Sequence, residues 1–370
     1  MRASDEEALL DAVAELGPAL LQVLVRFEQV LRHLHPPAVA GLRASLAEVE
    51  PPFSAARETF ASCPVPEPLS DFHARLARAG DHAHAALHAF LDTSPGRDAT
   101  LRVLGSMREH ARAQAALYPL RGALPPVNRY FFEPAVWDRI DALDPPPREG
   151  RRVGLHHARN APDERGGFTF FVPESYDDTP LPLVVALHGG AGHGGDFLWS
   201  WLREARSRRF LLLAPTSQGS TWSLMGPDVD AGRLDGMIAF VRERWAIDAE
   251  RILVTGLSDG ATYALLYGLR AEAPCSALAP VSGVLHPANF ANGNLERARD
   301  RRIYLVHGAL DWMFPIALAR SAAEQLERSG AQLEFREIAD LSHTYPRDEN
   351  ARILSWLDPA LALPADPPHP

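Results

Sequence analysis

The sequence predicts an α/β fold, in which a doubly wound, mainly parallel sheet is preceded by an all-α helical bundle. Two observations lead to this prediction. From about residue 151, short apolar runs alternate with helical patterns, which is typical of parallel strands buried on both faces. Before residue 121, apolar residues recur at helical spacing and no strand pattern is found. A chain of 370 residues is long enough for two such domains.

Composition shifts suggest four segments. Residues 1–121 form the predicted helical bundle, and residues 151–360 form the predicted α/β domain. Between them, residues 122–150 are rich in proline and aromatic residues and are expected to be a linker without regular structure. Because a free linker needs no aromatic residues, we expect it to pack on a domain surface, near the active cleft. Residues 361–370 are a proline-rich tail.

Charge and cysteine content exclude several classes of partner and site. The net charge is −10, which does not favour a nucleic-acid partner. Two cysteines provide neither a disulfide framework nor metal-ligand spacing. The N-terminus is acidic and lacks a signal-peptide core, and no apolar run approaches the length of a membrane span. We therefore expect a cytoplasmic protein without a transmembrane segment.

The N-terminal third reads as helices separated by proline-rich breaks. One helix is expected to end at about Gly17, and a second is expected to begin at Pro18. Further helices are expected at 39–48, 69–91 and 99–117. Asp81, His84 and His88 share helical spacing and could ligate a metal, but a solvated helix face explains them better. We expect no metal. The bundle could cap an active site, form a homo-oligomer or serve as a support.

The C-terminal two-thirds begins with two predicted antiparallel strands, 152–156 and 167–172, at a sheet edge. Further strands are expected, in chain order, at 181–187, 210–213, 251–255, 277–281, 303–306 and 332–338. Helices are expected at 196–207 and 231–245 and after residue 260. Active residues should then lie at the carboxyl ends of the strands.

The most informative segment is Gly256-Leu257-Ser258-Asp259-Gly260, which fits the pattern G-x-S-x-G. A buried strand precedes it and a helical pattern follows it. A nucleophile on such a sharp turn has a strained backbone, and its neighbours two residues away must be small because strand and helix nearly touch. The order of strand, turn and helix makes Ser258 a candidate nucleophile.

A serine nucleophile needs a base and a group that orients the base. After such a turn the expected order is serine, acid, histidine. Asp311 and His343 satisfy it, because each lies just beyond the carboxyl end of a predicted strand. The rivals are weaker: His307 is interpreted as closing a turn, and His286 comes too early in the chain. Asp340 is close to His343 but lies on the wrong side of it.

The glycine-rich segment after Leu187 predicts an oxyanion hole. Backbone N–H groups should bind the tetrahedral intermediate. One is expected from Asp259, whose carboxylate is expected to cap the following helix, and the other from Gly190, with Ala191 second. The alternative, a phosphate loop, is disfavoured because the segment lacks a Lys-Ser/Thr ending.

Several segments together resemble the α/β-hydrolases, and within them the phospholipase/carboxylesterase group. The matching pieces are LHGGAG, APTSQGSTWS, IDAERILVTGLSDGATYALLYGL, APVSG, VHGALDWMFP and LSHTYP. The last three also resemble polyhydroxyalkanoate-depolymerase-like and feruloyl-esterase-like enzymes. Gly260-Ala261 stands where these enzymes often have two glycines.

The resemblance implies a serine hydrolase that cleaves small or lipid-like carboxylic esters through an acyl-enzyme, without a cofactor. Ser258 would attack, His343 would carry the proton, and Asp311 would orient His343. Three aromatic residues are candidates for a substrate pocket because they are on loops expected near the cleft: Trp222, Trp312 and Phe314. Core packing is the simpler interpretation of each. Two alternatives remain: a thioesterase or peptidase with the same triad, or a non-catalytic scaffold.

Overall fold

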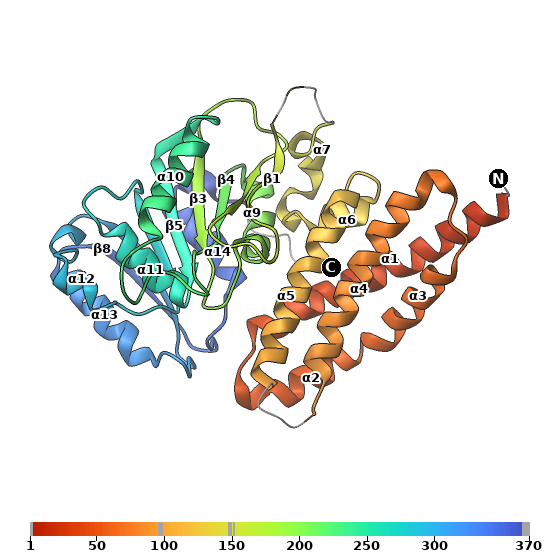
Figure 1. Cartoon of the computed structure of the whole chain (residues 1–370), viewed down its shortest axis with the longest axis horizontal. Helices are drawn as coiled ribbons and strands as arrows, with labels where there is room; N and C mark the ends of the chain where they lie inside the picture. The colour runs from red at the N-terminus through yellow and green to blue at the C-terminus, as the bar shows by residue number, and fades with distance from the viewer. Residues whose placement is uncertain (1–2, 95–98, 147–149, 151, 365–370) are drawn as a thin grey trace. The chain divides into compact units, whose positions relative to one another are not determined.

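The computed structural model describes residues 3–94, 99–146, 150 and 152–364. The chain divides into two compact units, residues 1–131 and 132–370 (Figure 1). The boundary falls inside the segment predicted as a linker. Most of the predicted proline-rich tail, residues 365–370, lies outside the described residues.

The N-terminal unit is all-α, as expected. In Figure 1 its long helices lie side by side. These helices are α1 (Ala3–Arg32), α2 (Val39–Ala47), α3 (Glu50–Ser62), α4 (Ser70–Leu91), α5 (Ala99–Leu117) and the short α6 (Pro125–Tyr130). Fully buried aromatic side chains fill the space between them, among them Phe27, Phe53 and Phe90. Phe27 meets Phe90 edge to face, with ring centroids 5.6 Å apart.

Proline positions explain where the predicted helices were wrong. Pro18 lies inside one continuous helix, α1, instead of starting a second one. Pro51 and Pro52, expected to be breakers, occupy the first turn of α3, and Pro125 and Pro126 occupy the first turn of α6. The first turn tolerates proline because its N–H groups have no intrahelical acceptor. The predicted linker is therefore partly helical.

One helix also corrects the expectation about apolar runs. In the described part of the chain, the 27-residue stretch Glu6–Arg32 is long and apolar enough to cross a membrane by length and composition. Leu16, Leu20 and Leu24 on this stretch are completely buried in the bundle. A buried core helix passes the same test, so the stretch is weak evidence for a membrane span.

The C-terminal unit is built on one eight-stranded sheet in the order β1-β2-β4-β3-β5-β6-β7-β8. The first two strands pair antiparallel at one edge, as predicted, and β2 is also antiparallel to β4. All other neighbours are parallel. The strands are β1 (Gly154–Ala158), β2 (Phe168–Val172), β3 (Leu181–Leu187), β4 (Leu211–Pro215), β5 (Ile247–Leu257), β6 (Ala277–Val281), β7 (Arg302–Gly308) and β8 (Gln332–Ile338).

Helices cover both faces of this sheet (Figure 1). On one face, α10 (Ala231–Arg242), α11 (Asp259–Gly268) and α13 (Ile316–Arg328) share a core with alternate strand residues such as Ile303 and Leu305. Tyr304, between those two, faces the other way and packs on Trp356 of α14 (Asn350–Leu357), with ring centroids 5.4 Å apart. The doubly wound arrangement is therefore as expected.

The remaining helices are short. The segment predicted as a single helix at 196–207 consists of α8 (Gly194–Phe197), a 3-10 turn and α9 (Leu202–Arg208). The others are α7 (Ile140–Leu143) and α12 (Ala288–Ala291). In the former linker, Phe132, Val136 and Leu143 form a small buried cluster within the C-terminal unit, together with Leu363. Phe132 therefore packs within the C-terminal unit, whereas Phe131 belongs to the N-terminal unit, where its ring meets Tyr118 edge to face.

Candidate active site

Ser258 lies on a sharp turn between β5 and α11, as the sequence predicted. Its backbone has φ 57° and ψ −117°, a conformation that a residue with a side chain rarely adopts. The N–H of Ser258 donates to the carbonyl of Val281 at 3.0 Å, and its carbonyl accepts the first helical bond, from Thr262. The turn therefore holds the hydroxyl at the carboxyl end of the central strand.

The neighbouring glycines are required by close backbone contacts. A Cβ on Gly256 would lie 2.6 Å from the carbonyl carbon of Gly260, and a Cβ on Gly260 would lie 2.3 Å from the carbonyl oxygen of Leu187. The side chain of Ala261 fits because Gly283 lies opposite. A Cβ on Gly283 would come within 2.7 Å of the Ala261 Cβ.

The structure brings Ser258, His343 and Asp311 together in one chain of hydrogen bonds. The Oγ of Ser258 is 2.9 Å from Nε2 of His343, and Nδ1 of His343 is 2.8 Å from Oδ2 of Asp311. An ionised carboxylate only accepts, so Nδ1 carries the proton and Nε2 is left to accept the serine hydroxyl. Ser258 is buried, with 9% of its surface exposed.

Both carboxylate oxygens of Asp311 accept hydrogen bonds. Its Oδ1 accepts hydrogen bonds from the N–H groups of Met313 and Phe314, at 3.0 and 2.8 Å. Burial alone would raise the pKa of Asp311, but the bonds from His343 and from the Phe314 N–H outweigh it and hold this pKa below its usual value. His307 closes the same turn, as predicted, with Nε2 donating to the Phe314 carbonyl at 2.7 Å.

The glycine-rich segment forms a tight turn beside Ser258. The N–H of Gly192 donates to the carbonyl of Gly189 at 3.0 Å, which closes the turn around Gly190 and Ala191. In the described part of the chain, the N–H of Gly190 has no acceptor within the protein, and the N–H of Asp259 precedes the first bond of α11. These two predicted oxyanion donors are therefore available.

Ala191 corrects the prediction of a second donor in this turn. Its N–H donates to the carbonyl of Ser220 at 2.8 Å, and its φ is 55°. That N–H is already used to attach the turn to the segment after β4. Ala191 therefore supports the turn and is not free to bind an oxyanion in this conformation.

Asp259 also has a different role from the helix cap that its position indicated. Its Oδ2 accepts a hydrogen bond from the hydroxyl of Thr221 at 2.6 Å, and α11 has no side-chain cap. The same Oδ2 would lie 2.7 Å from a Cβ placed on Gly190, so this glycine makes room for the carboxylate. The negative charge still lies in the first turn of α11, where the helix dipole favours it.

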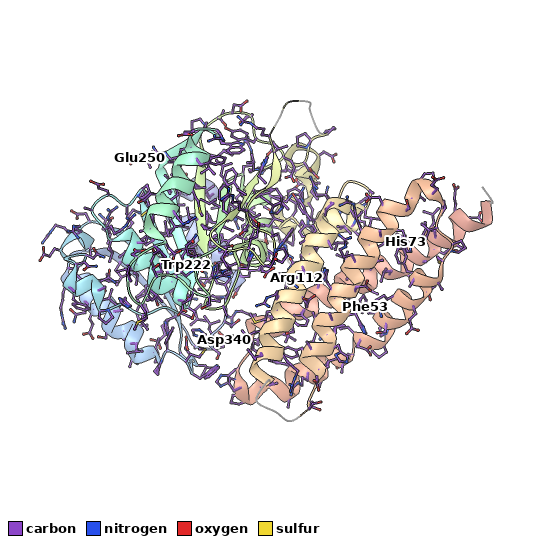
Figure 2. All side chains as sticks on the ribbon, in the orientation of Figure 1. Phe53, His73, Arg112, Trp222, Glu250 and Asp340 are labelled. Carbon is purple, nitrogen blue, oxygen red and sulfur yellow. The ribbon has the colours of Figure 1, made fainter. Side chains whose placement is uncertain are left out.

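The three aromatic residues proposed to line a substrate pocket differ in their placement. Trp222 is only 2% exposed, stacks on Tyr263 with centroids 5.3 Å apart, and donates from Nε1 to the His188 carbonyl at 2.7 Å. It lies inside the C-terminal unit (Figure 2) and forms core packing instead of an open pocket. Trp312, on the Asp311 loop, is 56% exposed, and the ring of Phe314 meets the His343 ring edge to face at 5.2 Å.

The loop after His343 is anchored to α9 and the turn before it. The hydroxyl of Tyr345 donates to Oδ1 of Asn350 at 2.8 Å, and Nδ2 of Asn350 donates to the carbonyl of Ser200 at 2.8 Å. Arg347 forms an ion pair with the buried Glu204, with Nη2 3.8 Å from Oε2. These contacts fix the chain that carries His343.

Glu204 predicts an unusual dependence of stability on pH. Burial raises the pKa of Glu204 to about 7 from 4.5, although Arg347 opposes the shift. Between pH 4.5 and about pH 7, Glu204 is protonated in the folded protein and ionised in the unfolded chain. The free energy of unfolding therefore falls as pH rises, by about 3 kcal/mol at most. Glu204→Gln should therefore be more stable than the parent at pH 8 and differ little at pH 4.5.

Thermal unfolding of both proteins between pH 4.5 and 8 measures this difference. If Glu204→Gln unfolds at a lower temperature than the parent at pH 8, the ion pair with Arg347 outweighs the cost of burial, and the prediction is wrong.

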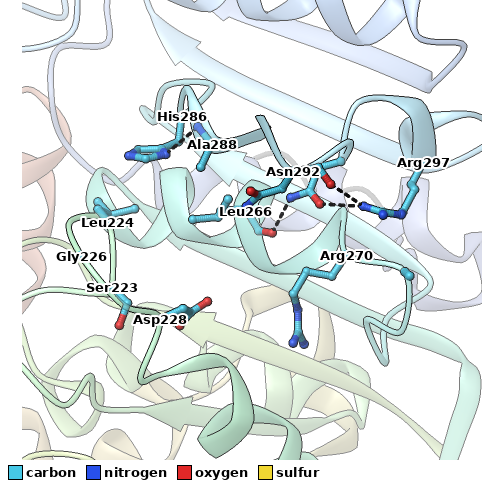
Figure 3. A pocket seen from close by; sticks show the side chains of 12 residues that line it. Ser223, Leu224, Gly226, Asp228, Leu266, Arg270, His286, Ala288, Asn292 and Arg297 are labelled. Carbon is cyan, nitrogen blue, oxygen red and sulfur yellow. Dashed lines mark hydrogen bonds between the residues drawn. The ribbon is translucent and has the colours of Figure 1, made fainter. Parts of the chain in front are cut away.

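A separate pocket of about 400 Å³ lies beside the C-terminal half of α11 (Figure 3). No triad residue lines it, whereas His286 does. Its polar groups bond to one another: Nη1 of Arg297 donates to the Asn292 carbonyl and to Oδ1 of Asn294, and Nδ2 of Asn294 donates to the Leu266 carbonyl. Arg297 and Asn294 are therefore already hydrogen-bonded within the protein.

The structure also places two residues that the sequence offered as alternatives, Asp340 and Asp81. Asp340 is exposed and is labelled in Figure 2. Within the described residues, no group of three or more histidine, cysteine, aspartate or glutamate side chains could hold a metal ion. Asp81 instead pairs with Arg57 at 2.8 Å.

Comparisons with known proteins find similarities to the C-terminal unit. Residues 224–360 match the family model described as Phospholipase/Carboxylesterase. A search of curated proteins gives no match. Similar solved structures include a thermostable esterase, with 21% identity and a TM-score of 0.45. The aligned region covers 55% of this chain and 61% of the esterase chain.

Two further similar structures come from named organisms. A phospholipase/carboxylesterase from Dyadobacter fermentans DSM 18053 has 21% identity and a TM-score of 0.41, covering 52% of this chain and 93% of its own. An acetyl xylan esterase from Aspergillus awamori has 15% identity and a TM-score of 0.44, covering 55% and 98%. The strand order and the nucleophile turn give the C-terminal unit an α/β-hydrolase fold, and its residues 224–360 are similar to the Phospholipase/Carboxylesterase family.

Proposed function

We propose that the protein is a serine hydrolase that cleaves carboxylic esters through an acyl-enzyme. The hydrogen-bond chain from Ser258 through His343 to Asp311 carries this proposal. The N–H groups of Gly190 and Asp259, which have no acceptor among the described residues, lie on the two segments that flank Ser258. This combination provides a nucleophile, a base, an orienting acid and donors for an oxyanion, which are the parts that acyl transfer requires.

In the first half of the reaction, Oγ of Ser258 attacks the ester carbonyl carbon while Nε2 of His343 takes the hydroxyl proton. The negative charge on the former carbonyl oxygen is bound by the N–H groups of Gly190 and Asp259. His343 then gives the proton to the departing alkoxide, and an alcohol leaves. Asp311 stabilises the imidazolium ion during this exchange.

In the second half, water takes the place of the alcohol. Nε2 of His343 removes a proton from the water, and the resulting hydroxide attacks the acyl carbon. The tetrahedral intermediate collapses, the proton passes to Oγ of Ser258, and the carboxylic acid is released. The serine and histidine return to their starting states, so the reaction needs no cofactor.

The loop that carries Asp311 supports an apolar substituent on the ester. Its residues Leu310, Trp312 and Met313 are all at least 42% exposed, and Phe314 lies against His343. Exposed apolar side chains next to a reaction centre gain free energy when an apolar group covers them. We therefore assign this loop to the binding of an acyl or aryl group.

Trp312→Ala tests this assignment. We expect kcat/KM for p-nitrophenyl octanoate to fall about tenfold, which corresponds to roughly 1.4 kcal/mol of lost contact, and kcat/KM for the acetate to fall less than about twofold. Trp137→Ala is a matched control, because Trp137 is similarly exposed at 47% but lies outside the Asp311 loop. Equal losses on both esters would contradict an acyl-binding role.

Hydrolysis of oxygen esters, thioesters and peptide anilides with the same acyl group tests the proposed reaction class. We expect kcat/KM to be highest for the oxygen esters. A higher value for the thioester or the anilide would replace the proposal with a thioesterase or a peptidase. The absence of turnover on every substrate, together with the absence of labelling by a fluorophosphonate, would indicate a non-catalytic scaffold.

A further inference from the structure

We infer that Arg165 is a positioning residue for the oxyanion hole, an inference that rests on the proposed function. Arg165 lies in the loop between β1 and β2, far in sequence from every residue of the triad. One guanidinium group ties together two other segments, the turn 189–192 that carries Gly190 and the segment 217–220 after β4. No pattern in the sequence indicates this role.

Arg165 donates hydrogen bonds to both of those segments. Nη1 donates to the carbonyl of Gly192 at 2.6 Å, and Nη2 donates to Oγ of Ser217 at 2.7 Å and also to the carbonyl of Gly219. The planar guanidinium holds several acceptors in a fixed relative geometry, which an ammonium group cannot do. Arg165 therefore sets the distance between the end of the oxyanion turn and the neighbouring segment.

The other attachments of the turn lead to the same segment. At its start, Nε2 of His188 accepts a hydrogen bond from the N–H of Ser217 at 3.1 Å, and in the middle the N–H of Ala191 donates to the Ser220 carbonyl. Burial lowers the pKa of His188 to about 3, so this ring stays neutral and can accept. Arg165 is the side chain that fixes the far end, at Gly192.

The loop that carries Arg165 is itself attached to the segment 217–220 and to His193, which directly follows the turn 189–192. The N–H of Gly166 donates to the carbonyl of Ser217 at 3.2 Å, and Nε2 of His193 donates to the carbonyl of Glu164 at 3.2 Å. The backbone that carries Arg165 is therefore held in place, so that its guanidinium group can orient the turn. A donor that is misplaced by about 1 Å can cost roughly 100-fold in rate, so the orientation of Gly190 matters for the reaction.

The proposal is tested with Arg165→Gln and Arg165→Lys, and with fluorophosphonate labelling and hydrolysis of p-nitrophenyl acetate as readouts. We expect kcat and the labelling rate to fall about 30- to 100-fold in both variants, while KM changes less than about threefold. Binding of a boronic acid, which forms a tetrahedral adduct with Ser258, should weaken in parallel with kcat. The pH dependence of kcat should keep its shape, because Arg165 does not contact His343.

Arg209→Gln is the matched control. Arg209 is a similarly half-buried arginine that braces another loop, with Nε 3.2 Å from Oγ of Ser175 and Nη2 3.1 Å from the Ser175 carbonyl. It should lower the melting temperature about as much as Arg165→Gln and leave kcat within about twofold. Adding guanidinium to Arg165→Ala should recover part of the lost labelling rate, which a general loss of folded protein would not allow.

The outcomes separate this inference from the proposed function. If the parent protein turns over esters and Arg165→Gln keeps kcat within about threefold, the positioning role is overturned and the esterase remains. If Arg209→Gln loses as much kcat as Arg165→Gln, the effect is general destabilisation, and the inference is wrong. If the parent protein shows neither turnover nor labelling, the proposed function fails, and the role of Arg165 fails with it.

Discussion

Ser258→Ala is expected to lower kcat for p-nitrophenyl esters by about 10⁶-fold, down to the residual rate that binding and the oxyanion donors supply. The change removes the nucleophile and the 2.9 Å hydrogen bond to His343, and it leaves the turn in place because alanine is no larger than serine. We expect the melting temperature to change by only a few degrees. Steady-state hydrolysis and thermal unfolding of purified protein measure both effects.

Ser282→Ala is the control for this prediction. Ser282 lies at the end of the neighbouring strand β6, also has a positive φ of 52°, and is buried, but its hydroxyl belongs to no hydrogen bond in the described part of the chain. The same substitution there should leave kcat within about tenfold. Substantial serine-independent turnover by Ser258→Ala would refute the assignment of the nucleophile.

Asp311→Asn is expected to lower kcat about 10³- to 10⁴-fold with little change in KM. Oδ1 would still accept the N–H groups of Met313 and Phe314, so the amide nitrogen would face His343. An amide nitrogen donates, which forces Nδ1 of His343 to accept and places the ring proton on Nε2. His343 could then no longer accept the proton of Ser258.

Asp340→Asn distinguishes Asp311 from the rival acid. Asp340 is exposed and lies three residues before His343. Its substitution should leave kcat within about twofold across pH 6 to 9. A larger loss in Asp340→Asn than in Asp311→Asn would transfer the orienting role to Asp340.

The meeting of Ser258, Asp311 and His343 could be predicted because each of them follows a recognisable strand. Parallel strands place their carboxyl ends at one edge of the sheet, so the order of Ser258, Asp311 and His343 was enough to predict that they meet. The same reasoning located Gly190, since the glycine-rich segment also follows a strand. These inferences need only the strand pattern and the chain order.

The parts that were mispredicted depend on contacts between segments distant in the sequence. Nothing near Ala191 shows that its N–H is taken by the Ser220 carbonyl, and nothing near Asp259 shows that Thr221 reaches its carboxylate. Arg165 was missed for the same reason. Trp222 illustrates another limit, because an aromatic residue on a predicted loop can enter the core when a stacking partner such as Tyr263 lies beneath it.

Proline was the main source of error in the helical unit. Its effect depends on its position within a helix, and the sequence does not show that position until the helix start is known. Pro51 and Pro52 start α3, whereas Pro18 is accommodated within α1, so neither site marks a break. The predicted strands at 181–187, 277–281 and 332–338 agree with β3, β6 and β8, because long apolar or alternating runs constrain strands more strongly.

The most direct test of the central claim is the reaction of the purified full-length chain with a fluorophosphonate, followed by mass spectrometry of the modified peptide. The account predicts one adduct per chain, on Ser258, with labelling that is abolished in Ser258→Ala and strongly slowed in Asp311→Asn. An adduct on any other serine, or an unmodified Ser258 in folded protein, would contradict it.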